Sequence, residues 1–354
     1  MQPRLKKTYI CKQVSNYQLQ TDIADNYVPV DGDVAIFEVL RIGKHKTVQN
    51  HEKRNSTILP GDYIMAAFGT RYATAQFEGY LPASVHDELH ILGAGGTVGC
   101  IASMHHKFSH VGPTKLRCVG LAVDAQGTVI NTKAIAAAGM RRFSGAAAAS
   151  TRVIFSVGSS MDSGKTTSAA YLVHGLTKAG HKAAYIKLTG TVYSKDADLA
   201  LDLGACASID FSMFGFPSTY MCPMNELLPL YESLLLQVLP HQPDFVVIEI
   251  ADGLYERETS MLLQHAAFTD SAYGFMFSAG DSLAAINGIR VLNDWGIQPL
   301  FITGLLTASP LLMQETARHT ALPIFNLAQL AQPDISAQIF ARKLATQEVL
   351  SQVS

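Results

Sequence analysis

The sequence is short of cysteine, net charge and long apolar runs, and each shortage excludes a class of protein. Its five cysteines are odd in number and none forms a C-x-x-C pair, which predicts a reduced, cytoplasmic protein without a disulfide framework. The formal net charge is −2, so we expect no nucleic acid partner. No stretch approaches the roughly 18 apolar residues of a membrane span, and the basic start, MQPRLKKTYICKQ, lacks the apolar segment of a signal peptide. No membrane association is therefore expected.

The chain is long enough for two domains, and its two halves differ in texture. Of the 354 residues 48% are apolar, which allows each domain its own core. We predict a β-rich domain over residues 1–150 and a second domain over residues 151–354, with the boundary near Ser150 in a linker rich in Ala and Gly. Short strand-forming runs between Gly and Pro turns predict a small barrel or sandwich in the first domain, at residues 34–42, 63–68 and 73–80.

The second domain alternates strands with helices, which predicts an α/β fold with a parallel sheet covered on both faces. Its first stretch, TRVIFSVGSSMDSGKTT over residues 151–167, has the strand, small-residue loop, Gly-Lys-Thr and helix of a phosphate-binding loop. Small residues let backbone N–H groups surround an anion, the helix N-terminus adds positive charge, and the lysine can reach the terminal phosphates. The predicted nucleotide-binding residues are Gly158, Ser160, Asp162, Ser163, Gly164, Lys165, Thr166 and Thr167.

This loop departs from the usual G-x-x-x-x-G-K-[ST] pattern at one position. The first glycine of the pattern falls on Ser159, and Gly158 stands one residue early. An ordinary strand–helix joint with a Gly/Ser loop is therefore the alternative. The flanking strand and amphipathic helix favour the phosphate-binding interpretation.

Charged residues end two further apolar strands of this domain. Lys187 follows residues 183–186, and Glu249 closes the run FVVIE. Because the carboxyl ends of parallel strands meet at one edge of a sheet, we expect both side chains near the phosphate-binding loop, together with Asp196. A charge within an apolar run must be paired or ligated. Glu249 is therefore a stronger indication of a functional site than Lys187 is.

These residues define the predicted chemistry. Lys165 and Lys187 are the predicted catalytic residues, because cations stabilise charge on a transferred phosphoryl group. Hard oxygen ligands suit Mg²⁺, and the predicted ligands are Thr166, Asp196 and Glu249. The alternatives are a solvated loop lysine for Lys187, the start of a surface helix for Asp196, and Asp252 in place of Glu249 as the metal-organising carboxylate.

Two weaker patterns lie in the first domain. The glycines of residues 90–99 lack the spacing of a dinucleotide-binding turn, so we expect a tight turn there rather than a ligand loop. Cys100, His105, His106 and His110 fit no standard zinc spacing, and surface or packed histidines are favoured over a metal site.

Residues 151–333 resemble dethiobiotin synthetase and its relatives in the SIMIBI class of P-loop proteins. The resemblance rests on the loop SSMDSGKTT, the strand and turn AYIKLTG, and the sequences KDA and EIADG. It implies a second catalytic lysine at Lys187, a metal–nucleotide contact at Asp196 and the family glutamate at Glu249. Where the family often places an asparagine for the purine, this chain reads LLTAS over residues 305–309, and residues 1–150 have no counterpart.

Two functions follow as hypotheses. The first is a Mg²⁺- and ATP-dependent enzyme that transfers the γ-phosphoryl group to a small-molecule carboxylate or carbamate and so drives a ligation or cyclisation, with GTP as the alternative nucleotide. The second is a nucleotide-hydrolysing switch or adaptor that acts on a protein partner. A polynucleotide kinase is a third reading, disfavoured by the near-neutral charge. The resemblance also implies a homodimer.

Overall fold

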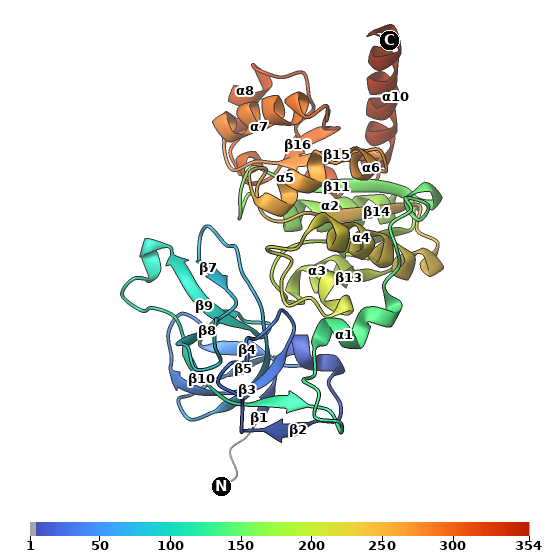
Figure 1. The fold of residues 1–354 in the computed structure, drawn as a ribbon. Helices are drawn as coiled ribbons and strands as arrows, with labels where there is room; N and C mark the ends of the chain where they lie inside the picture. Colours follow the sequence, from blue (N-terminus) through green and yellow to red (C-terminus); the bar gives the residue numbers. More distant parts are fainter. Residues whose placement is uncertain (1–4, 354) are drawn as a thin grey trace. The chain divides into compact units, whose positions relative to one another are not determined.

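The computed structural model describes residues 5–353, with side chains up to residue 344, and the chain forms two compact units (Figure 1). The β-rich unit comprises Met1–Met140, Gly190–Ser194 and Phe211–Cys222. The α/β unit comprises Arg141–Thr189, Lys195–Asp210 and Pro223–Ser354. The sequence suggested one boundary near Ser150, whereas the chain crosses between units at Met140 and returns twice to the β-rich unit.

The β-rich unit is built on an eight-stranded sheet with the order β1-β6-β3-β10-β8-β9-β7, in which β2 pairs with β10. An additional pairing of β9 with β6 closes the strands β6, β3, β10, β8 and β9 into a ring, which confirms the barrel prediction. The bounds are β1 Leu5–Lys7, β2 Gln18–Gln20, β3 Val34–Arg41, β4 Thr47–Gln49, β5 Asn55–Thr57, β6 Tyr63–Phe68, β7 Phe77–Tyr80, β8 Leu89–Gly93, β9 Thr97–Met104 and β10 Lys115–Val123.

Apolar side chains fill the interior of this ring. Phe37 of β3 and Phe68 of β6 are fully buried, with ring centroids 5.2 Å apart. The run at residues 73–80 is a strand only from Phe77, because the backbone N–H of Gln76 closes a turn on the carbonyl of Ala73. The glycine-rich residues 90–99 form the β8–β9 hairpin, so the tight turn expected there is present.

The α/β unit holds a six-stranded sheet in the order β13-β12-β14-β11-β15-β16, and every pairing in it is parallel. The strands are β11 Arg152–Gly158, β12 Ala183–Lys187, β13 Ser208–Asp210, β14 Phe245–Glu249, β15 Gly274–Ser278 and β16 Phe301–Thr303. The helices are α2 Lys165–Lys178, α3 Lys195–Asp202, α4 Met224–Val238, α5 Arg257–Leu263, α6 Ala266–Thr269, α7 Ser282–Asp294, α8 Pro310–Ala317, α9 Leu327–Leu330 and α10 Ile335–Val353.

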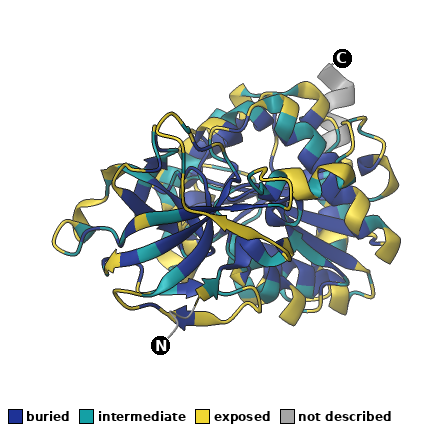
Figure 2. Ribbon diagram, turned by 60° about the horizontal axis from the view of Figure 1, so that its bottom comes forward, coloured by how far each residue is buried: buried dark blue, intermediate teal, exposed yellow. Residues whose placement is uncertain are grey.

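Alternate residues of β11 face opposite helical layers, as the period of a strand requires. Ile154 belongs to the core beneath α2, α9 and α10. Phe155, its neighbour, packs on the other face against Tyr231 of α4 and Phe268 of α6, with centroids 5.8 and 4.4 Å away. In Figure 2 the dark blue of buried residues lies mainly on strands, and the yellow of exposed residues lies mainly on helices and loops. The predicted parallel sheet with helices on both faces is confirmed.

Two local expectations need correction. Residues 135–150 were expected to be a linker, but they include the end of helix α1 (Thr132–Ala136) and short 3₁₀ turns. The buried carboxylate of Glu232 fixes this segment by accepting hydrogen bonds from Ser144 Oγ at 2.7 Å and from the N–H groups of Gly145 and Ala147 at 3.1 and 3.2 Å.

The second correction concerns residues 322–325, because the alternation of strands and helices in this half of the sequence predicts a last strand there. The structure gives them an isolated bridge between Ile324 and Ile302, because Pro323 lacks the N–H that a ladder needs.

Among the described residues, no helix is both long and apolar enough to cross a membrane.

Candidate functional site

The loop between β11 and α2 is shaped by residues whose backbones turn sharply. Asp162 and Gly164 adopt positive φ values of 61° and 97°. At Gly158 a Cβ atom would stand 2.3 Å from Ser163 Oγ, so this position accepts no side chain without rearrangement. The early glycine of the motif is therefore required by close approach of the loop. The backbone N–H of Ser159 is fixed on the carbonyl of Ser278 at 2.9 Å.

Lys165 opens α2 with its amine turned into the loop. The residue is 5% exposed, and Nζ donates to the carbonyl of Ser160 at 2.8 Å and to the carbonyl of Asp252. Burial lowers the pKa of Lys165, and the carboxylates of Glu249 and Asp252 oppose that shift. Both close acceptors of the amine are neutral carbonyls, so an arriving anion would gain a charged partner here.

Glu249 ends β14 as a buried carboxylate with two different hydrogen-bond donors. It is 2% exposed, and its Oε1 accepts from Thr166 Oγ1 at 2.9 Å. Its Oε2 accepts from the hydroxyl of Tyr185 on β12. The parallel register sets Lys187 opposite Glu249, and Lys187 Nζ lies 4.0 Å from Oε1. A charge within an apolar strand is thus tolerated because polar groups of two other elements, α2 and β12, surround it.

Lys187 is paired with the carboxylate of Asp196, in the first turn of α3. Burial alone would lower the pKa of Lys187, but the nearby charges of Asp196 and Glu249 outweigh it and raise that pKa. The amine therefore stays protonated throughout the neutral range. A permanent positive charge is what stabilisation of a phosphoryl group requires.

These side chains line one cleft of about 490 Å³ at the carboxyl edge of the sheet. Three of the predicted nucleotide-binding residues, Gly158, Ser160 and Ser163, are not among its lining residues. Ser160 contributes its carbonyl to Lys165, and Gly158 and Ser163 are buried against each other. Its lining residues are Met161, Asp162, Gly164, Lys165, Thr166, Thr167, Lys187, Asp196, Glu249, Ala251, Asp252 and Leu305.

Sequence reasoning missed the residues that orient these groups. Tyr185 precedes Lys187 by two positions, so both point to the same face of β12, a signal that strand periodicity could have supplied. Thr189 Oγ1 donates to the carbonyl of Ala251 and accepts from its N–H, both at 2.8 Å, and Thr259 Oγ1 donates to the same carbonyl at 2.8 Å. These two threonines fix the segment that presents the Asp252 carbonyl to Lys165.

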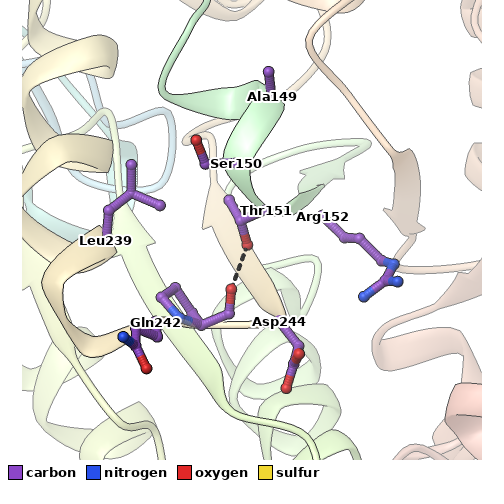
Figure 3. A pocket seen from close by; sticks show the side chains of 8 residues that line it. Ala149, Ser150, Thr151, Arg152, Leu239, Gln242 and Asp244 are labelled. Carbon is purple, nitrogen blue, oxygen red and sulfur yellow. Dashed lines mark hydrogen bonds between the residues drawn. The ribbon is translucent and has the colours of Figure 1, made fainter.

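A larger cavity, of about 640 Å³, lies at the opposite edge of the same sheet, where β11 and β14 begin (Figure 3). There Thr151 Oγ1 donates to the carbonyl of Pro243 at 2.8 Å. Among the described residues that line it, Arg152 and Asp244 carry charged side chains. Ligands of open parallel sheets bind at the carboxyl ends of the strands, so the smaller cleft is the better candidate despite its size.

The sulfur and histidine side chains of the β-rich unit do not form a cluster. Cys100 donates to the carbonyl of Glu88 at 3.4 Å, and His105 Nδ1 accepts from the N–H of Lys107 at 3.1 Å. His106 and His110 are exposed. Within the described part of the chain, no group of three or more His, Cys, Asp or Glu side chains is arranged to hold a metal ion.

The α/β unit thus has a parallel sheet and a strand–loop–helix segment with the form of a phosphate-binding loop, which is the architecture of P-loop proteins. No family model matches the chain, and no curated protein matches it. Solved structures with a similar fold include the hydrogenase maturation factor HypB from Archaeoglobus fulgidus, at 10% identity and a TM-score of 0.34, covering 60% of this chain and 97% of that one.

Two further structures resemble the chain at a similar distance. The septum site-determining protein MinD from Pyrococcus horikoshii, complexed with Mg-ADP, matches at 17% identity and a TM-score of 0.30, over 54% of this chain and 86% of that one. The signal recognition particle receptor FtsY from Elizabethkingia anophelis matches at 16% identity and a TM-score of 0.31, over 44% of this chain and 50% of that one. Similarity at this level assigns no activity to the chain. The resemblance to dethiobiotin synthetase stays a prediction.

Replacing Tyr185 by Phe tests how far Glu249 depends on its hydroxyl donor. The change removes a buried hydrogen bond to a carboxylate and should lower the free energy of unfolding by about 1–3 kcal/mol. Urea denaturation at neutral pH measures this. Tyr171→Phe, on partly buried Tyr171 of α2, is the matched control and should stay within about 0.5 kcal/mol of wild type. Equal stabilities of the two variants would contradict this role for Tyr185.

A second buried carboxyl group lies behind the cleft, at the N-terminus of α5. Glu256 is 6% exposed, its Oε2 accepts a hydrogen bond from Thr259 N at 2.8 Å, and the same oxygen lies 3.0 Å from Thr259 Oγ1, whose proton is directed to the Ala251 carbonyl. Burial, together with the neighbouring Glu258, raises the pKa of Glu256 to about 9. The group is therefore protonated at neutral pH in the folded protein. Glu256 holds Thr259 in place, and the Thr259 hydroxyl in turn donates to the Ala251 carbonyl.

This raised pKa predicts a loss of stability with rising pH. Between the ordinary pKa of 4.5 and about 9, the folded protein binds a proton at Glu256 that the unfolded chain releases. The free energy of unfolding should therefore fall as pH rises through that window, by up to about 1.4 kcal/mol per pH unit. Urea denaturation from pH 5 to 9 should show a shallower decline for Glu256→Gln. The exposed-site control, Glu315→Gln, should keep the wild-type slope; an unchanged slope in Glu256→Gln would refute the assignment.

Proposed function

We propose that the cleft binds a Mg²⁺–nucleoside triphosphate and that the protein transfers its γ-phosphoryl group to the carboxylate or carbamate of a small molecule. Nucleotide hydrolysis is the minimum activity. The observation that carries the proposal is that the amines of Lys165 and Lys187 line one cleft together with the carboxylate of Glu249. Two cations at one strand edge suit a triphosphate tail, and an intervening carboxylate suits its metal.

The residues present fit a magnesium ion. Thr166 Oγ1 and Glu249 Oε1 are hard oxygen donors 2.9 Å apart, and they would hold Mg²⁺ at the start of α2. Asp196 would be a third donor on release of Lys187, with which it is now paired. Mg²⁺, when bound, would neutralise charge on the phosphates. Tyr185 keeps Glu249 Oε2 occupied, so that Oε1 is the oxygen turned to Thr166 and Lys187.

The two lysines have different parts in the proposed step. Lys165, within the loop, would exchange its carbonyl partners for phosphate oxygens. Lys187 would stabilise charge on the group in transit. An acceptor carboxylate oxygen forms a bond to the γ-phosphorus while the bond from that phosphorus to the bridging oxygen breaks, and its electron pair leaves with the nucleoside diphosphate. The resulting mixed anhydride is then attacked by an amine, which releases inorganic phosphate.

A nucleotide-driven switch is the second candidate, and one feature of the chain favours it. Lys187 and Asp196 form an ion pair, yet the chain between them includes Gly190–Ser194, which belongs to the β-rich unit. Lys187 and Asp196 flank Gly190–Ser194 in the chain. If Lys187 exchanged Asp196 for a phosphate group, the residues on both sides of that segment would therefore lose their ion pair. Under this proposal hydrolysis would alter the β-rich unit and, through it, a protein partner. A homodimer would accommodate either function.

Replacing Lys187 by Ala should lower the turnover number by about 10²–10³, because a fixed positive charge at the transferred group is lost. Nucleotide-dependent phosphate release at saturating ATP, and separately GTP, measures the effect. Lys195→Ala, on the exposed neighbour that begins α3, is the control and should retain wild-type turnover. Wild-type turnover in Lys187→Ala would remove Lys187 from the chemistry.

The acceptor can be sought by trapping the mixed anhydride. With ATP or GTP, Mg²⁺, hydroxylamine and a panel of small carboxylates, we expect one acceptor to accelerate diphosphate release and to yield its hydroxamate in equal amount, detected by mass spectrometry. Slow turnover that no acceptor accelerates, and that a protein partner does, would favour the switch instead. Absence of any heat of binding with either nucleotide in calorimetry would overturn both.

A further inference from the structure

Basic side chains gather in the β-rich unit around the start of β7. Lys44 and His45 follow β3, Arg71 follows β6, and Gln76 immediately precedes β7. Lys107 lies in the short 3₁₀ turn that follows β9. The cluster therefore joins three separate stretches of the chain, residues 44–45, residues 71–76 and Lys107.

One neutral oxygen serves two of these cations. Gln76 Oε1 accepts from Lys44 Nζ and, at 2.8 Å, from Arg71 Nη2. Lys44 Nζ also lies 3.1 Å from His45 Nε2. A lysine amine that leaves water is normally matched by an opposite charge. The acceptor that Lys44 shares with Arg71 is an amide, which carries no charge, while Arg71 Nη1 also donates to the carbonyl of Leu92.

The other neighbours of Lys44 are aromatic. Its Nζ is 5.8 Å from the ring centroid of Phe77 and 5.7 Å from that of Phe108, and Lys107 Nζ is 5.2 Å from the Phe108 centroid. Aromatic faces attract cations, but more weakly than a carboxylate does. Among the described residues, the side-chain contacts of Lys44 are to an amide, an imidazole and two rings, and none is to a carboxylate.

The electrostatics agree with this geometry. Burial lowers the pKa of Lys44 to about 8, with the charges of Arg71 and Lys107 adding to the shift. Burial, Lys44 and Arg71 likewise hold the pKa of His45 well below its usual range. All the charges named as acting on these two groups are positive. An anion between Lys44 and Arg71 would relieve that repulsion and favour the protonated amine.

We propose that this cluster binds a small oxyanion, the carboxylate or phosphate group of a small molecule, which replaces the Gln76 carbonyl between Lys44 and Arg71. The Gln76 oxygen then marks the position of one oxygen of the ligand. Gln76 lies in a half-buried turn, so its side chain can withdraw without disturbing the ring of strands. This site is independent of the phosphate-binding loop and of the function proposed above.

Calorimetric titration of the full chain with inorganic phosphate and, separately, with acetate tests the proposal. We expect saturable binding that weakens as pH rises through about 8, because Lys44 loses its proton there. Lys44→Met should weaken that binding by about tenfold or more, the effect of losing a charge-assisted hydrogen bond. Lys46→Met, on the exposed lysine two residues away, should leave it unchanged.

A second variant keeps the test decisive if Lys44→Met unfolds. Gln76→Glu places an internal carboxylate between the two cations, so it should block added anion and raise the thermal midpoint. Binding of both probes would indicate a general oxyanion site, and binding of phosphate alone a phosphorylated ligand. Phosphate bound at the phosphate-binding loop would persist in Lys44→Met and in Gln76→Glu. Equal affinities in Lys44→Met, Gln76→Glu and Lys46→Met, or no saturable binding, would overturn the proposal.

Discussion

The buried carboxylate of Glu249 is the constraint on which the candidate site depends. A carboxylate that is 2% exposed at the end of an apolar strand is stable only if its oxygens are satisfied. Thr166 and Tyr185 each donate to one oxygen, and Lys187 stands 4.0 Å away. Meeting that requirement draws α2, β12 and β14 to one point, and the proposed function uses two of the groups that meet it, Thr166 and Lys187.

The two lysine-centred sites show how the neighbourhood of an amine decides its charge. Lys187 is partly buried, but Asp196 and Glu249 lie beside it, and its pKa is raised. Lys44 is also partly buried, but its charged neighbours are Arg71 and Lys107, and its pKa is lowered. Burial acts in the same direction on both amines. The sign of the neighbouring charge therefore separates a permanent cation from one that titrates near pH 8.

The chain path ties the candidate site to the β-rich unit. Gly190–Ser194 leaves the α/β unit just after Lys187 and returns just before Asp196, and Phe211–Cys222 leaves directly after β13. Both excursions start at the carboxyl ends of strands, where parallel sheets place their ligands. A ligand at the cleft is thus a few residues of backbone from segments that the β-rich unit holds. This connectivity is compatible with both proposed functions, the acceptor-binding enzyme and the nucleotide-driven switch.

The sequence alone determined what depends on near neighbours in the chain. This includes the strand, small-residue loop and helix of residues 151–167, the alternation that makes a parallel sheet, and the strands Val34–Arg41 and Tyr63–Phe68, because periodicity and small-residue loops are local. The roles predicted for Lys187, Asp196 and Glu249 remain predictions, although the structure gathers these residues in one cleft. Only the tertiary structure decided the closure of β6 on β9, the hydroxyl of Tyr185 on Glu249 and the meeting of Lys44 with Arg71. Each of these joins residues far apart along the chain, and strand register and packing bring them together in ways that no local pattern specifies.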